Sequence, residues 1–136
     1  MTEAFKIFPM NGGKLNKCFF LIDKDADKFV SHLLVVKESF SNHRRKVVGF
    51  PRTGDIFYLS SFGTMSDYRR KGYGRKLMNF VKENTKGQFI YLIVHSPSER
   101  IITDKQLVKL YESFGFKVHE KKDEYKDYTW MILDNR

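Results

Sequence analysis

A basic, glycine-containing segment, YRRKGYGRKLM, occupies residues 68–78. Gly72 and Gly74 lack Cβ atoms and allow positive φ, so consecutive N–H groups can point into one concavity. The apolar spacing over 77–81 predicts that the segment opens a helix, whose first N–H groups lack intrahelical partners and lie at the positive end of its dipole. The segment therefore predicts a pyrophosphate site, with a surface turn carrying solvated charge as the alternative.

The glycine spacing separates this segment from other phosphate-binding motifs. It reads R-x-x-G-x-G over residues 69–74, which is neither the G-x-x-x-x-G-K-[ST] loop of NTPases nor the G-x-G-x-x-G dinucleotide fingerprint. A strand is predicted immediately upstream, over 56–65, and a second motif, LYESFGF, occupies 110–116.

These two motifs, in this order and about forty residues apart, resemble those of the GNAT family of acyl-CoA N-acyltransferases. The resemblance covers roughly residues 47–133, and in that family the first motif binds the pyrophosphate of acetyl-CoA. Carried over by position, it implies a cofactor loop made of Arg69, Arg70, Lys71, Gly72, Tyr73, Gly74 and Arg75.

The same resemblance implies a proton donor and a carbonyl-binding strand end. Tyr111 matches the family tyrosine that protonates the leaving sulfur, and a phenol of pKa about 10 can donate to a thiolate of pKa about 8.5. The alternative is that Tyr111 packs with Leu107 and Phe114. At the strand end, the N–H of Phe62 or Thr64 is expected to polarise the thioester carbonyl.

The general base has several candidates. Family members often carry a glutamate on the strand before the loop, where this chain has Ser60 and Ser61. His95 is the leading candidate because imidazole titrates near neutrality, although it can equally satisfy local hydrogen bonds or face solvent. The remaining candidates are ordered water and the carboxylates of Asp55, Asp67 and Glu99.

Three further positions are open to two interpretations. Tyr58 and Tyr128 can line an acceptor pocket or pack in the core. Asp104 stands seven residues before Tyr111, where family members often carry an asparagine, and capping a helix is its expected role.

Length and composition are typical of one globular domain over residues 1–136. The hydrophobic fraction is 41%, and no apolar run approaches the ~20 residues that span a bilayer. The N-terminal residues show no secretory signal, which predicts a cytoplasmic protein. The single cysteine, Cys18, has apolar neighbours and is predicted to be a buried structural thiol.

The net charge of +9 bears on partners. It attracts anions such as CoA and disfavours a polycationic acceptor, so we expect an acceptor that is neutral or attached to an anionic body. Nucleic acid would exploit the same charge, but it is not favoured because the chain lacks a recognition motif. No membrane partner or bound metal is expected, and the protein is expected to be a monomer or homodimer.

The predicted elements form a mixed α/β (α+β) fold. Strands are expected at 5–8, 32–37, 46–50, 56–65, 89–94, 117–120 and 128–133, with helices at 74–84 and 104–113. The apolar run at 18–22 fits a strand or a helix, and the family favours a helix. Together these predict a GNAT-like central mixed sheet of about six or seven strands, with an antiparallel N-terminal half and flanking helices.

The predicted function is therefore acetyl transfer from acetyl-CoA to a primary amine by direct attack in a ternary complex, since no Cys or Ser is paired with a base in an evident triad. Two alternatives are a small basic nucleic-acid-binding protein and a CoA-binding GNAT-fold protein without catalysis.

Overall fold

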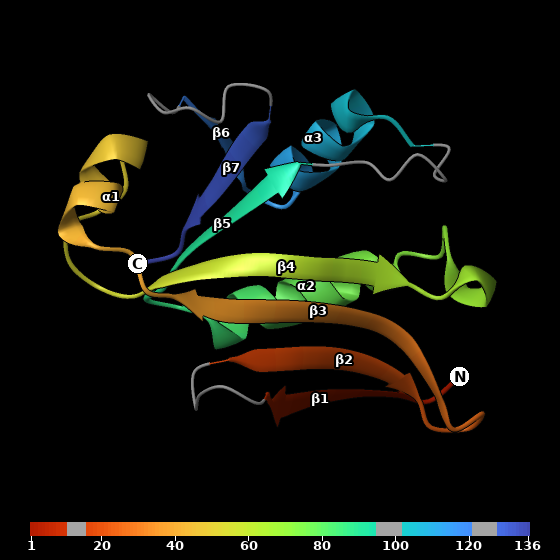
Figure 1. Cartoon of the computed structure of the whole chain (residues 1–136). Coiled ribbons are helices and arrows are strands. Elements are labelled where there is room, and N and C mark those ends of the chain that lie inside the picture. The colour runs from red at the N-terminus through yellow and green to blue at the C-terminus, as the bar shows by residue number, and fades with distance from the viewer. Residues whose placement is uncertain (11–15, 95–101, 121–127) are drawn as a thin grey trace. The chain divides into compact units, whose positions relative to one another are not determined.

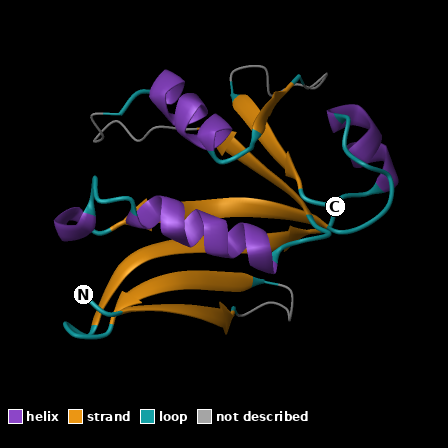
Figure 2. Cartoon of the chain, turned by 180° about the vertical axis from the view of Figure 1, so that it is seen from behind, coloured by secondary structure: helices purple, strands orange, loops and turns teal. Residues whose placement is uncertain are grey.

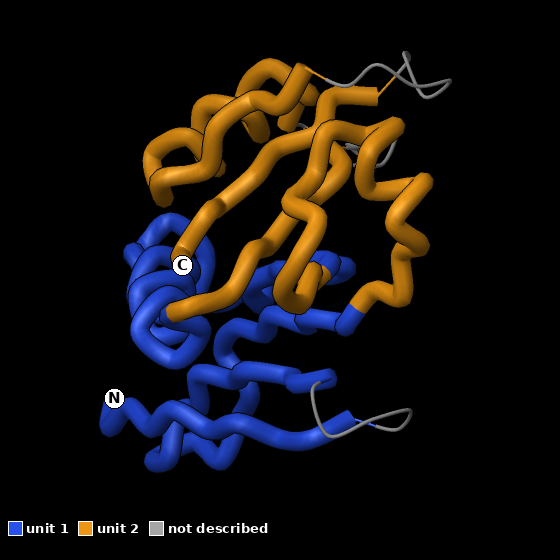
Figure 3. The backbone as a smooth tube through the Cα atoms, turned by 90° about the vertical axis from the view of Figure 1, so that its left-hand side faces the viewer, with its two compact units in different colours: residues 1–37, 58–86 blue, residues 38–57, 87–136 orange. Residues whose placement is uncertain are grey.

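The computed structural model describes residues 1–10, 16–94, 102–120 and 128–136. Its chain forms two compact units (Figure 3). The first unit comprises residues 1–37 and 58–86, and the second comprises residues 38–57 and 87–136. Each is described separately below.

Four strands follow one another across the first unit in the order β1-β2-β3-β4 (Figure 1). They are β1 (Glu3–Pro9), β2 (Lys17–Asp23), β3 (Lys28–Glu38) and β4 (Ile56–Thr64). β2 is antiparallel to both β1 and β3, with Phe19 opposite Ile7 on one side and Leu33 on the other. The antiparallel N-terminal half is thus as predicted.

One helix, α2 (Tyr73–Asn84), lies across a single face of these strands (Figure 2). Its residues Leu77, Met78 and Val81 are buried, and the Phe80 ring stacks on Phe5 with centroids 4.6 Å apart and meets the edge of Phe19 at 6.2 Å. This apolar stripe therefore holds the start of α2 beside the end of β4.

The second unit contains three strands in the order β5-β7-β6 and two helices. The strands are β5 (Phe89–Val94), β6 (Lys117–His119) and β7 (Thr129–Asp134), and the helices are α1 (Asn42–Val48) and α3 (Asp104–Ser113). β7 is antiparallel to both of its neighbours. Phe50 centres the aromatic core, with ring centroids 5.1 to 5.7 Å from those of Phe89, Tyr91 and Trp130.

The helix expected at 18–22 is wrong, because these residues belong to β2. Side chains alternate along it: Phe19 and Leu21 are fully buried, whereas Phe20 and Ile22 are half-buried on the other face. A period of two is the strand pattern, and the residues themselves favoured it over the arrangement expected from the family.

The strand expected at 46–50 is also wrong, because α1 ends there. The Ser41 hydroxyl accepts the Arg44 N–H at 3.1 Å and starts the helix, and Gly49 ends it in the left-handed region at φ 75°. The positive charges of Arg45 and Lys46 in the last turn interact favourably with the negative C-terminal end of the helix dipole. These caps outweigh the strand preference of the two adjacent valines.

The remaining elements are confirmed, with small shifts at their ends. β3 is longer than predicted, and α3 is capped by the Thr103 hydroxyl, so Asp104 is its first residue and not its N-cap. The fold class is mixed α+β with seven strands, as predicted. No helix in the described ranges is long and apolar enough to cross a membrane. Cys18 is buried, as predicted, and burial raises its pKa.

Candidate functional site

The segment between β4 and α2 is held in an unusual backbone conformation. After the short 3-10 helix η1 (Ser66–Tyr68), Arg70 has φ 62° and Gly72 has φ 81°, so two residues that are two positions apart lie in the left-handed region. Glycine adopts this region at little cost, but a residue with a Cβ loses about 1–2 kcal/mol there. Backbone strain of this kind is typical of ligand clamps.

Gly72 also leaves the start of α2 open. It is the N-cap residue, and no side chain in the described chain caps the helix there. The first helical bond runs from the Lys76 N–H to the Gly72 carbonyl, so the N–H groups of Tyr73 and Gly74 precede the first intrahelical bond. Amide donors at the positive end of a helix are a geometry suited to an anion.

Gly74 is required by packing rather than by its backbone angles. A Cβ at this position would lie 3.3 Å from both Phe62 Cζ and Thr64 Oγ1. Two of the predicted site residues, Phe62 and Thr64, therefore lie directly against the start of α2, and the absence of a side chain at Gly74 brings the helix and strand together.

The predicted cationic residues fall into two groups. Arg69 donates from Nε to the Thr64 carbonyl at 2.9 Å, and Lys76 pairs with Glu3, a hydrogen bond that raises the pKa of Lys76. Both side chains thus brace the loop. Arg70 and Lys71 are exposed and form no ion pair within the described part of the chain, and Arg75 is exposed on the first turn of α2.

A buried carboxylate fixes the far end of the loop. Asp23 accepts the N–H groups of Asp25 and Ala26 in the β2–β3 turn through Oδ1, and the Tyr68 hydroxyl at 2.9 Å through Oδ2. Burial acts to raise its pKa, but the hydrogen bonds from Tyr68 and the two amides outweigh burial and lower the pKa of Asp23. The same hydrogen bond raises the pKa of Tyr68.

We expect Tyr68→Phe to reduce the acid sensitivity of the fold. A carboxyl whose folded pKa is lowered stabilises the protein above its unfolded pKa of about 3.9, and this stabilisation is lost as the pH falls through the lower folded value. Without the Tyr68 hydroxyl the folded pKa returns toward the unfolded one. Urea unfolding between about pH 6 and pH 3 should therefore show a smaller loss of unfolding free energy in Tyr68→Phe than in the wild type.

Tyr128→Phe is the matched control, since it removes a hydroxyl from a side chain that is 47% exposed. Parallel pH dependence in Tyr68→Phe and the wild type would contradict the role of this hydrogen bond.

The last strand residues before the loop are tied to β3. The Ser31 hydroxyl donates to the Gly63 carbonyl at 2.9 Å and lies 3.0 Å from Thr64 Oγ1, and the Met65 N–H donates to the Val30 carbonyl. Side-chain bonds replace part of the usual ladder here. The end of β4 is therefore fixed in place although it precedes an irregular loop.

The predicted catalytic residues belong to the second unit or lie outside the described residues. Tyr111, in the last turn of α3, is half-buried, with its ring edge-on to Phe114 at 6.2 Å and to Phe116 at 5.6 Å. Its packing against Phe114 is as the alternative interpretation expected. His95 and Glu99 lie outside the described residues, and Asp55 and Asp67 are exposed.

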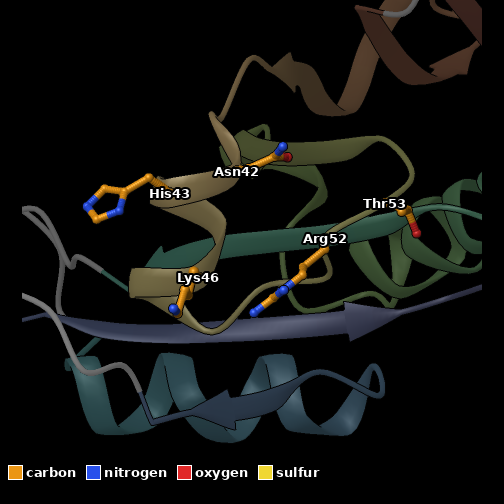
Figure 4. Close-up of a pocket in the computed structure, with 5 residues that line it drawn as sticks. All are labelled: Asn42, His43, Lys46, Arg52 and Thr53. Atoms are coloured by element: carbon orange, nitrogen blue, oxygen red, sulfur yellow. The ribbon is translucent and has the colours of Figure 1, made fainter.

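A basic pocket of about 430 Å³ lies in the second unit, lined by Asn42, His43, Lys46, Arg52 and Thr53. Figure 4 shows Arg52 extending toward Lys46, whereas His43 points away. Arg45 fixes the loop beside it by donating to the carbonyls of Pro51 and Gly54. None of the residues that line this pocket is a predicted site residue, so they serve as controls for substitutions in the segment between β4 and α2.

Sequence reasoning missed Asp23, Ser31 and the left-handed Arg70. Asp23 carried a weak signal, since it opens the turn sequence DKDAD, in which an aspartate often accepts nearby amides. The other two depend on contacts between distant strands and on loop closure. Within the described residues, no group of His, Cys, Asp and Glu is arranged to hold a metal.

Several solved structures have folds similar to that of this chain. Arabidopsis thaliana NAA60 with a bisubstrate analogue has a TM-score of 0.62 at 15% identity, covering 99% of this chain and 100% of that one. Arabidopsis thaliana Naa50 with the bisubstrate analogue CoA-Ac-MVNAL has 0.56 at 18%, covering 86% and 72%. The Escherichia coli ribosomal-protein-S18-alanine N-acetyltransferase has 0.54 at 19%, covering 90% and 71%.

Two sequence comparisons complete these findings. No curated protein sequence matches the chain. The family model of the acetyltransferase (GNAT) domain matches residues 26–132, which include the strained loop, the open start of α2 and Tyr111. This chain is therefore a member of the GNAT acetyltransferase family.

Proposed function

We propose that the protein is an N-acetyltransferase that moves an acetyl group from acetyl-CoA to a primary amine by direct attack in a ternary complex. The observation that carries this proposal is the uncapped start of α2 beside the left-handed Arg70 and Gly72. Amide donors at a helix start and exposed cations fit a pyrophosphate. Gly74 has no Cβ, which allows the start of α2 to pack closely on Phe62 and Thr64 of β4.

The cofactor would be held by the loop predicted from sequence. The N–H groups of Tyr73 and Gly74 would bind phosphate oxygens, and the side chains of Arg70, Lys71 and Arg75 would add charge. The amides of Phe62 or Thr64, at the anchored end of β4, would polarise the acetyl carbonyl. Acetyl-CoA bound in this way supplies an activated acyl group, and Tyr111 would supply the proton for the departing sulfur.

A covalent intermediate on cysteine is disfavoured. Cys18 is 7% exposed, and burial raises its pKa, so little thiolate is available at neutral pH. Direct attack by the amine needs no enzyme nucleophile. It requires a bound carbonyl, a deprotonated amine and a proton for the departing sulfur.

The acceptor class follows from charge and from the similar folds. The Naa50 structure contains the peptide sequence MVNAL joined to CoA, and this supports testing a free peptide α-amine first. The net charge of +9 supports acceptors that are neutral or attached to an anionic body and disfavours polyamines.

The test begins with thermal unfolding in the presence of acetyl-CoA, CoA or ATP. A ligand at 100 times its Kd adds about 2.7 kcal/mol, or roughly 8 °C for a domain of this size. We expect a shift with both CoA species and not with ATP. Thiol release is then followed with MVNAL peptide, Nα-acetyl-lysine amide and spermine as acceptors.

The outcomes separate the three functions. A shift with CoA but no thiol release from any acceptor supports a CoA-binding protein without catalysis. A shift with none of the ligands, together with salt-dependent binding of single-stranded RNA that Arg70→Glu weakens, supports the nucleic-acid alternative.

A further inference from the structure

A histidine on β3 is hydrogen-bonded to a serine on β4 beside the proposed thioester site. His32 Nε2 and Ser61 Oγ are 2.8 Å apart, and both side chains are half-buried. The imidazole also lies over Gly63: a Cβ at that glycine would be 3.1 Å from His32 Cε1, 3.8 Å from Nδ1 and 3.9 Å from Nε2. The three atoms nearest to that position all belong to the His32 ring.

Gly63 lies within the strand segment proposed to bind the acetyl carbonyl. Gly63 separates Phe62 from Thr64, the two residues whose amides are proposed to polarise the acetyl carbonyl. The His32 ring therefore rests on the strand segment assigned to the reacting carbonyl. A larger residue at 63 would displace the ring, so the glycine is what allows this approach.

The His32 side chain lies on the face of the sheet opposite α2. Its neighbours in sequence, Ser31 and Leu33, are buried, and Leu33 pairs with Phe19, which packs on α2. His32 itself pairs with Phe20. Among the described residues, no helix of the first unit covers this face (Figure 1).

The strand pairings show which groups of the first unit share this face with His32. They place Lys6 of β1 one strand beyond Phe20, and Cys18 of β2 opposite Leu34. β4 contributes Ser61, and α2 packs on the other face. An imidazole of ordinary pKa can accept a proton near neutrality, which suits this side chain to the role of a base.

We propose that His32 is the general base that removes a proton from the acceptor ammonium, with Ser61 holding the ring in position. This inference rests on the proposed N-acetyltransferase function. A primary amine is mostly protonated at neutral pH and cannot attack until one proton has left. His32 accepts that proton and later passes it to solvent.

The remaining step balances without any other reactant. The amine nitrogen forms a bond to the acetyl carbon, the carbon–sulfur bond breaks, and its electron pair stays on sulfur. The second nitrogen proton passes to solvent as the amide forms, sulfur gains a proton from Tyr111, and Tyr111 is reprotonated from solvent. The products are an N-acetyl amide, CoA thiol and one proton released to solvent through His32.

The decisive experiment is the pH dependence of kcat/KM for thiol release with the acceptor of the three above that reacts fastest. We expect His32→Gln, which keeps a hydrogen bond to Ser61, to lower kcat/KM by about 10²-fold at pH 7 and to remove the inflection near the His32 pKa. At higher pH, where free amine is abundant, the variant should recover. His43→Gln, an exposed histidine of the basic pocket, should match the wild type.

A second variant separates the base from a covalent mechanism. If Ser61 were an acetylated nucleophile activated by His32, Ser61→Ala would abolish transfer and the wild type would show an acetylated Ser61 by mass spectrometry. We expect instead a loss of about tenfold or less and no acetyl-enzyme, because Ser61 only orients the ring.

A binding readout keeps the test independent of turnover. The His32 imidazole NMR signals, assigned by their loss in His32→Gln, should shift when CoA is added, whereas those of His43 should not. Unchanged His32 signals, or the same pH profile in His32→Gln as in the wild type, would overturn the role of His32. If the wild type still transferred acetyl groups, the proposed function would stand. Absence of transfer to all three acceptors would overturn both.

Discussion

Gly74→Asp should remove acetyl-CoA binding while leaving a folded protein. The new Cβ would lie 3.3 Å from Phe62 Cζ and Thr64 Oγ1, so these side chains must shift slightly, and the carboxylate would lie among the amide donors proposed to bind phosphate. Two like charges about 4 Å apart near a protein surface repel by about 4 kcal/mol at an effective dielectric constant of 20. We therefore expect at least about a 10²-fold increase in Kd.

The fold should tolerate this change, because an acidic residue in the first turn of a helix favours its dipole. Thermal shift and isothermal titration with acetyl-CoA measure the effect. Gly74→Ala adds a methyl group without the charge, so its affinity for acetyl-CoA should fall between those of the wild type and Gly74→Asp. Asn42→Asp adds the same charge in the basic pocket of the second unit and should bind acetyl-CoA as the wild type does. Full affinity in Gly74→Asp would show that the loop does not bind the cofactor.

The loop was predictable from sequence because its requirements are local. Glycine at 72 and 74, cations around them and an amphipathic helix afterwards all lie within a dozen residues, and each has a direct structural consequence. The structure adds why Gly72 and Gly74 differ. Gly72 supplies a left-handed N-cap, whereas Gly74 supplies close packing on Phe62 and Thr64.

The supports of the loop were not predictable, because they join residues distant in sequence. Asp23 and Tyr68 are 45 positions apart, Ser31 and Thr64 are 33 apart, and His32 and Ser61 are 29 apart. Each contact depends on the register of β2, β3 and β4. The prediction of a helix at 18–22 removed β2 from the sheet and with it any means of placing these side chains.

The incorrect elements share a physical cause. The apolar run at 18–22 is five residues long, and at 46–50 only Val47 and Val48 are adjacent apolar residues, so both segments are too short for their period to distinguish a strand from a helix. The outcome was decided by neighbours: strand pairing on both sides of β2, and caps at Ser41 and Gly49 for α1. Longer elements such as β5 and α2 were predicted within one residue because their own patterns were sufficient.

Tyr111→Phe should lower turnover while sparing acetyl-CoA affinity. The substitution keeps the ring that packs edge-on against Phe114 and Phe116, so α3 and the apolar contacts at its end remain. It removes only the hydroxyl proposed to protonate the departing sulfur. Positioned acids typically contribute 10² to 10⁴ in rate, and we expect kcat to fall by about 10²-fold with Kd for acetyl-CoA changed by less than about threefold.

The pH dependence distinguishes an acid from a packing residue. If Tyr111 donates the proton, the wild-type rate falls at high pH as the phenol ionises, and this fall is lost in Tyr111→Phe, where the thiolate must take its proton from solvent. Tyr91→Phe removes a hydroxyl that donates to Glu38 and has no role in the proposed site, and it should keep both the rate and the profile. An undiminished kcat in Tyr111→Phe would assign this tyrosine to packing alone. Together with the His32 experiment, it tests separately the two proton transfers that acetylation of an amine requires.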